Sequence, residues 1–181
     1  MSSYPQRKSP RLQGYDYSQE GAYFVTICTH NREHLFGFIA NDKMQLNSYG
    51  EIVLKEWQQT ASQRPYLDLD SFVVMPNHVH GIIVITGKNE AKGRTASLQN
   101  TQSNNAITKP VHSGSLSAII RAFKSAVTKR INEQRYTPSA PVWQERYHDH
   151  IIRNEVELNK LREYILYNPA SWQADKLFIS G

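Results

Sequence analysis

The chain has 181 residues, 39% of them hydrophobic and 20% charged, which suits one globular domain with a proper core. The net charge of +5 favours a polyanionic partner, above all nucleic acid. Cys28 is the single cysteine, which excludes an intramolecular disulfide and suggests a reducing cytoplasm. No apolar run reaches the ~20 residues of a membrane span, and the first residues lack an apolar signal core. We therefore expect a cytoplasmic protein with no membrane partner.

Residues 1–20 combine basic charge with little apolar content. Their basic side chains are Arg7, Lys8 and Arg11. Such a segment is either a frayed terminus or an arm that contacts DNA. Aromatic and β-branched residues then dominate positions 22–29 and predict a strand. A short second strand is expected within 35–39 or 43–46, after a polar turn.

A first helix is expected after Ser48, which forms a capping-box pattern with Glu51. Apolar residues recur at helical spacing beyond it, and Pro65 ends the helix. Two apolar runs then flank His78 and His80, and we interpret them as two strands or as one bent strand. Because strand side chains alternate, the two imidazoles share one face and could bind one divalent metal. A structural pair of histidines is the competing interpretation.

Polar residues dominate positions 87–114, which we interpret as a loop or an insertion. A second helix is expected from Ser115 to about Arg135, with an apolar stripe of hydrophobic side chains. Arg121 and Lys124 lie on this helix, where they could follow a phosphate backbone or simply face solvent.

A final core strand is expected within 142–152, a segment that contains Trp143 and a second pair of histidines. Trp143 could stack on unpaired bases, although packing is an equal alternative. His148 and His150 could also ligate metal, but we favour packing, DNA contact or support of another site. Asn154 then predicts the start of a third helix.

The third helix carries Tyr164 and Asn168, which lie four residues apart and so share one face. Should that face meet His78 and His80, the two imidazoles and the Asn168 carbonyl could hold a divalent cation. Tyr164 could then attack phosphorus and become covalently joined to the phosphoryl group. Tyr167 is a second candidate nucleophile, which we rank lower because it does not share a face with Asn168.

The order of elements favours an α+β fold with an antiparallel sheet. We expect the ferredoxin-like (RRM-like) arrangement, with helices packed mainly on one face and the histidine pair on a central strand. We expect a single catalytic domain over 21–175, preceded by the arm 1–20 and followed by a tail over 176–181.

Six segments, in order, resemble the REP-associated tyrosine transposases, a branch of the single-tyrosine HUH transposases. The matching segments are residues 21–29, 74–81, 122–125, 142–144, 150–155 and 164–169. Each segment alone is a weak signal, whereas the ordered set is specific. Histidine-triad hydrolases do not fit, because Ile82 stands where a third alternating histidine would be needed.

This resemblance implies a metal-dependent enzyme that cuts and rejoins single-stranded DNA near a hairpin through a 5′-phosphotyrosine. It implies Tyr164 as the nucleophile and His78, His80 and Asn168 as ligands of Mg²⁺ or Mn²⁺. It also implies a nucleoid-associated protein that acts as a monomer or a homodimer. The candidate DNA contacts are Arg7, Lys8, Arg11, Arg121, Lys124, Trp143 and His150. Two alternatives stay open: a non-catalytic module that binds single-stranded or hairpin nucleic acid, and a metal phosphoesterase that acts on small nucleotides.

Overall fold

The computed structural model describes residue 17 and residues 19–86 and 114–178. The basic arm with Arg7, Lys8 and Arg11, and nearly all of the polar segment 87–114, lie outside the described residues. No helix within the described ranges is long and apolar enough to cross a membrane.

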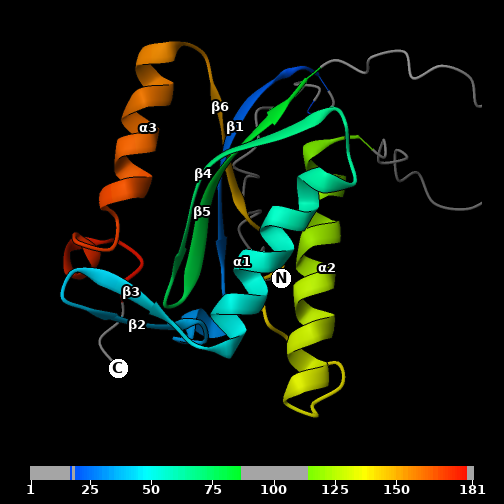
Figure 1. The fold of residues 1–181 in the computed structure, drawn as a ribbon, viewed down its shortest axis with the longest axis vertical. Coiled ribbons are helices and arrows are strands. Elements are labelled where there is room, and N and C mark those ends of the chain that lie inside the picture. Colours follow the sequence, from blue (N-terminus) through cyan, green and yellow to red (C-terminus); the bar gives the residue numbers. More distant parts are fainter. Residues whose placement is uncertain (1–16, 18, 87–113, 179–181) are drawn as a thin grey trace, which may run out of the picture.

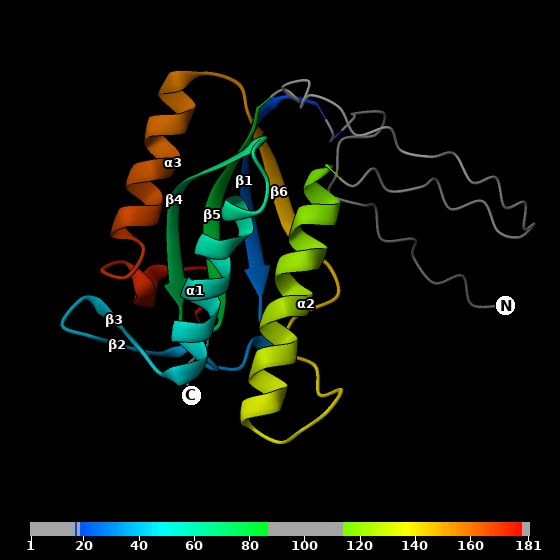
Figure 2. The ribbon, with the colours of Figure 1, turned by 45° about the vertical axis from the view of Figure 1, so that its right-hand side comes forward.

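A four-stranded antiparallel sheet in the order β4-β5-β1-β6 forms the centre of the domain. Its strands are β1 (Gly21–Cys28), β4 (Leu67–Met75), β5 (His78–Ile85) and β6 (His148–Ile152). The helices are α1 (Ser48–Ser62), α2 (Leu116–Gln134) and α3 (Glu155–Tyr167), with short 3-10 turns at His30–Arg32 and Trp172–Ala174. Helices α1 and α2 cover one face of the sheet, and α3 lies against the other (Figures 1 and 2). The predicted ferredoxin-like arrangement, with two of three helices on one face, is confirmed.

The alternation of side chains in β1 separates the core from the opposite face of the sheet. Tyr23, Val25 and Ile27 are fully buried in the cluster that includes residues of α1 and α2. Phe24 and Thr26 point the other way and contact the ring of Tyr164 and the imidazole of His80, respectively. Because side chains alternate along the strand, one set of β1 residues packs in the core, and the other set faces α3 and the histidine pair.

Two details of the expected elements are corrected by the structure. Both suggested segments near residue 40 form strands, β2 (Gly37–Ala40) and β3 (Lys43–Leu46), which pair as a hairpin outside the main sheet. The N-cap of α1 is Asn47, and the predicted capping box at Ser48 is wrong. The Asn47 Oδ1 accepts hydrogen bonds from the backbone N–H groups of Tyr49 and Gly50, both at 3.0 Å. An asparagine in extended backbone conformation satisfies these orphan donors one residue earlier than serine would.

The histidine pair begins β5, which is joined to β4 by a tight turn at residues 76 and 77. The two apolar runs are thus two strands and not one bent strand. Strand β5 pairs with β4 on one side and with β1 on the other, so the histidines do lie on a central strand.

Gly81 alone among the residues of β5 has no side chain, and the α1 ring of Trp57 occupies the space beside it. A Cβ at position 81 would lie 2.5 Å from the Trp57 Cζ2 atom and 2.7 Å from its Cη2 atom. We expect Gly81→Ala to lower the free energy of unfolding by about 1–3 kcal/mol, because overpacking forces the ring or the strand to shift. Urea denaturation would measure this effect. In the double variant Gly81→Ala/Trp57→Phe, the smaller ring leaves room for the new methyl group. The loss in free energy of unfolding should therefore be smaller than the sum of the two single losses, and full additivity would contradict the steric explanation.

Candidate active site

The imidazoles of His78 and His80 face one another on the α3 side of the sheet. Their Nε2 atoms are 3.0 Å apart, and the side chains are 0% and 3% exposed. The Nδ1 atom of His78 lies 2.8 Å from Asn77 Oδ1, and that of His80 lies 2.8 Å from Thr26 Oγ1. Because each Nδ1–H can donate to its oxygen, this tautomer leaves both Nε2 lone pairs directed at one point.

Burial keeps both rings neutral. It is the largest cause that lowers the pKa of His78 and of His80 to about 3, and the charge of Arg32 adds to the effect on His78. The nearby His78 also lowers the pKa of His80, whereas Asp175 opposes this shift. Neutral imidazole is the form that ligates metal, so the pair is available for coordination at physiological pH.

The spacing of the two nitrogens fits a divalent cation. Adjacent ligands at about 2.1 Å in an octahedral shell lie about 3.0 Å apart, which is the geometry Mg²⁺ demands. A carboxylate completes the group, because ligand atoms of His78, His80 and Asp175 all lie within 4.8 Å of one another. These three side chains could hold a divalent metal ion. Among the described residues, His148 and His150 take no part in this group.

The hydroxyl of Tyr164 reaches the same place from α3. It lies 3.3 Å from His80 Nε2 and 3.4 Å from Asp175 Oδ2. The Tyr164 ring packs edge-on against Phe24 and His80, and 44% of the residue stays exposed. Burial, followed by the charge of Asp175, raises the pKa of the phenol, and a hydrogen bond with Asn168 lowers it in part. A nucleophilic role would therefore require activation of this phenol.

Asn168 is the C-cap of α3 and is 2% exposed. Its Nδ2 atom donates to Asp175 Oδ2 at 3.1 Å, whereas its Oδ1 atom is buried without a hydrogen-bond partner among the described residues. A buried carbonyl oxygen with no donor is uncommon and calls for an explanation such as an ion or water. The amide oxygen thus fits a metal ligand in its chemistry.

These groups line a cleft of about 720 Å³, which also receives His148 of β6 and Lys160 of α3. Within a single chain, Tyr164 contacts His80, whereas Asn168 lines the same cleft and reaches the site through its hydrogen bond to Asp175. Asp175 was missed: it lies beyond Pro169 in a segment without secondary-structure periodicity, and no pattern in the sequence indicated it.

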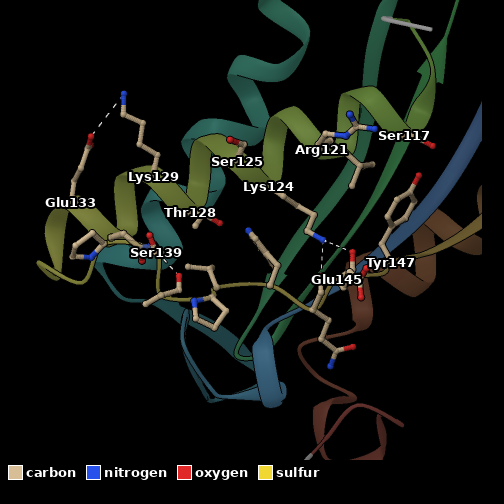
Figure 3. Close-up of a pocket in the computed structure, with 18 of the residues that line it drawn as sticks. Ser117, Arg121, Lys124, Ser125, Thr128, Lys129, Glu133, Ser139, Glu145 and Tyr147 are labelled. Carbon is tan, nitrogen blue, oxygen red and sulfur yellow. Dashed lines mark hydrogen bonds and ion pairs between the residues drawn. The ribbon is translucent and has the colours of Figure 1, made fainter. Parts of the chain in front are cut away.

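The other candidate DNA contacts lie elsewhere. Arg121, Lys124 and Trp143 line a separate cavity of about 1000 Å³ between α2 and residues 136–147 (Figure 3). Lys124 Nζ donates to the backbone carbonyls of Gln144 at 2.6 Å and Glu145 at 3.0 Å. His150 is half exposed and pairs with Glu157 at 2.7 Å. Three of these candidate DNA contacts therefore lie together around one cavity, and His150 lies outside it.

No family model matches the chain. A Haemophilus influenzae protein of uncharacterised function is 40% identical over 178 residues, covering 96% of this chain and 93% of that protein. A second Haemophilus influenzae protein, assigned by name to the REP-associated tyrosine transposases, is 24% identical over 154 residues, covering 85% and 73% of the two chains. A solved structure of a REP-associated tyrosine transposase bound to a REP hairpin superposes with a TM-score of 0.59 at 19% identity, covering 97% of this chain and 77% of that one.

The chain has an antiparallel ferredoxin-like sheet with a histidine pair on a central strand, and it shares this fold with the solved REP-associated tyrosine transposase. The chain belongs to the same family as the 40% identical Haemophilus influenzae protein, over nearly the full length of both. At lower identity, the chain is also similar to the Haemophilus influenzae protein assigned by name to the REP-associated tyrosine transposases.

Proposed function

We propose that this protein is a metal-dependent endonuclease and strand transferase that acts on single-stranded DNA through a 5′-phosphotyrosine at Tyr164. One observation carries the proposal: the Tyr164 hydroxyl lies 3.3 Å from the Nε2 atom of His80, within one chain. A phosphate held at the histidine pair would therefore lie within reach of the phenol. Because one chain supplies every group, a monomer is competent for the reaction, and we place it in the cytoplasm where DNA is found.

His78, His80 and the Asn168 amide oxygen hold Mg²⁺ or Mn²⁺ in this proposal. Such a cation would supply Lewis-acid stabilisation of the charge on the scissile phosphate. The Tyr164 oxygen attacks phosphorus, an O–P bond forms, and the bond from phosphorus to the 3′ oxygen breaks. The released 3′ oxygen takes a proton from solvent, which leaves a free 3′-OH and a 5′-phosphotyrosine. Attack of a 3′-OH on that phosphotyrosine reverses the step and rejoins DNA.

The phenolic proton needs an acceptor, and Asp175 is placed to receive it. Its Oδ2 atom lies 3.4 Å from the Tyr164 hydroxyl. We expect Asp175→Asn to slow formation of the covalent adduct about 10²–10⁴-fold, the usual contribution of a general base. Single-turnover quench experiments would measure this rate. Mn²⁺ affinity measured on the same variant separates the two roles of Asp175: an unchanged affinity supports the base, and a large loss identifies a ligand instead.

The proposed partner is hairpin DNA with a single-stranded flank. The relative that superposes on this chain is bound to a REP hairpin. In this chain, the cavity beside α2 presents Arg121 and Lys124 together with the ring of Tyr136, which is 90% exposed. Trp143 also borders the cavity, but it is 7% exposed and packs in the hydrophobic core. Cations that follow a phosphate backbone and aromatic faces that accept bases are the usual elements of such surfaces.

Arg121→Gln should weaken hairpin binding and reduce the slope of log affinity against log salt by about 1, because one phosphate contact is lost. Fluorescence anisotropy at several salt concentrations would measure both quantities. Lys55→Gln is the matched control, since Lys55 is an exposed cation on α1, outside this cavity. Equal effects of the two substitutions would assign the change to net charge and contradict a role of the cavity.

The proposal as a whole is tested by incubating the protein with hairpin-bearing single-stranded DNA and Mg²⁺ or Mn²⁺. A denaturant-resistant protein–DNA product, together with a free 3′-OH, is the expected result. Tight binding without that product would favour the non-catalytic binding module. Turnover of small nucleotides without an adduct would favour the phosphoesterase.

A further inference from the structure

Helix α3 carries the proposed nucleophile but is held to the sheet by little apolar contact. Ile165 is the one buried residue in the helix, and Leu158 and Leu161 are only partly buried. Val156, Leu166 and Tyr167 are all more than 60% exposed. Apolar burial of this extent leaves rotation of the helix about its own axis weakly restrained, so another contact must fix it.

A two-pronged ion pair between Arg162 and Asp70 of β4 supplies that restraint. Arg162 Nε lies 3.0 and 3.2 Å from the two carboxylate oxygens, and its Nη2 atom lies 2.6 Å from Asp70 Oδ2. The third nitrogen, Nη1, donates to Asn159 Oδ1 at 2.9 Å and ties the guanidinium to its own helix. Bidentate pairs restrict direction as well as distance, which a single contact does not.

The carboxylate of Asp70, the β4 partner in this ion pair, is also held in place. Asp70 and Ser71 form an irregularity in β4, where the register with β5 shifts between Leu69 and Phe72. The Ser71 backbone N–H donates to Asp70 Oδ1 at 2.6 Å, and its hydroxyl donates to the same atom at 3.0 Å. The bulge thus aims the carboxylate at α3, as bulges in strands commonly do for a functional side chain.

Arg162 and Tyr164 project from opposite sides of α3. They are two residues apart, which corresponds to about 200° around the helix axis. The ion pair therefore anchors one side of the helix to β4, while the other side presents the phenol above β1 and β5. A rotation of about 20° would move a hydroxyl at a radius of about 8 Å by about 3 Å, which would separate it from His80.

We infer that the Asp70–Arg162 pair is a positioning element that sets the rotation of α3 and so holds the Tyr164 hydroxyl over the histidine pair. The inference rests on the proposed function of Tyr164. Neither residue touches the reacting atoms, so both act through the helix. A misplacement of about 1 Å at a reacting atom can slow a reaction about 100-fold, which sets the scale of the expected effect.

Asp70→Asn and Arg162→Lys test the inference. We expect the rate of covalent adduct formation on hairpin DNA to fall about 10- to 100-fold in Asp70→Asn. The decrease should be smaller in Arg162→Lys, which keeps the charge but loses the second prong. Hairpin affinity should stay within twofold in both variants, and Asp70→Glu should restore part of the rate. Arg130→Gln is the matched control, because it removes an Arg–Glu pair between α1 and α2, far from α3.

A second measurement reports the position of Tyr164 without metal or DNA. Nuclear Overhauser contacts between the Tyr164 and Phe24 rings, whose centroids are 6.0 Å apart, should be present in the wild type and in Arg130→Gln. They should weaken or vanish in Asp70→Asn while circular dichroism shows an intact fold. The inference would be overturned by ring contacts that stay unchanged in Asp70→Asn. It would also be overturned if Asp70→Asn formed the adduct as fast as an active wild-type protein. A different outcome would refute the proposed function alone: the ring contacts weaken in Asp70→Asn as expected, but the wild-type protein forms no adduct.

Discussion

Tyr164→Phe should abolish the covalent protein–DNA adduct on hairpin single-stranded DNA while hairpin affinity stays within about twofold. The substitution removes the oxygen that we propose attacks phosphorus and leaves the aromatic ring, which packs against Phe24 and His80. Loss of a covalent nucleophile commonly lowers the rate by about 10⁶-fold, which is below detection in a gel assay. Denaturing electrophoresis of labelled DNA would measure the adduct, and anisotropy would measure the binding.

Tyr167→Phe is the matched control for this prediction. Tyr167 lies on the same helix and borders the same cleft, but 62% of it is exposed, and no hydrogen bond joins its hydroxyl to the histidines among the described contacts. The control should form the adduct at close to the wild-type rate. An adduct that persists in Tyr164→Phe and disappears in Tyr167→Phe would identify Tyr167, and not Tyr164, as the nucleophile.

His78→Ala should abolish metal-dependent cleavage and weaken binding of Mn²⁺ by at least about 100-fold. The reason is geometric, because the Nε2 atoms of His78 and His80 are 3.0 Å apart and would share one ion. Loss of an outer-shell partner alone commonly costs 10–100-fold in metal affinity, so loss of a direct ligand should cost more. Isothermal titration calorimetry would measure the affinity in the absence of DNA.

His30→Ala serves as the control, since this histidine lies outside both the cleft and the group of metal-binding side chains. It should bind Mn²⁺ as the wild type does. Retained cleavage with full metal dependence in His78→Ala would refute the ligand assignment. Denaturation by urea would check that His78→Ala is folded, because burial of this position means that the substitution leaves a cavity.

Local rules in the sequence predicted much of this fold. Alternation in β1, the cap at Asn154 and the apolar stripe of α2 all describe neighbours within a few residues, where backbone geometry determines which side chains share a face. The cap of α1 was misplaced by one residue, because Asn47 and Ser48 are both good caps and only the backbone conformation distinguishes them.

Relations across long separations could not be predicted in this way. Asp70 and Arg162 are 92 positions apart, and Asp175 reaches the histidine pair from a segment that follows the last long helix. Nothing in the local pattern around these residues distinguishes them from solvated acidic and basic side chains. Their roles arise from packing of α3 on the sheet, which brings β4 and the segment after the helix to the same face.

By its own pattern, the chain determines that His78 and His80 share a strand face and that Tyr164 and Asn168 share a helix face. Each statement follows from the period of one element. Only the tertiary structure decides that the two faces meet, with 3.3 Å between the phenol and His80. It also decides that a carboxylate, Asp175, lies between them. The physical reason is that the distance between two elements depends on the packing and ion pairs that dock them, and these involve residues remote from either motif.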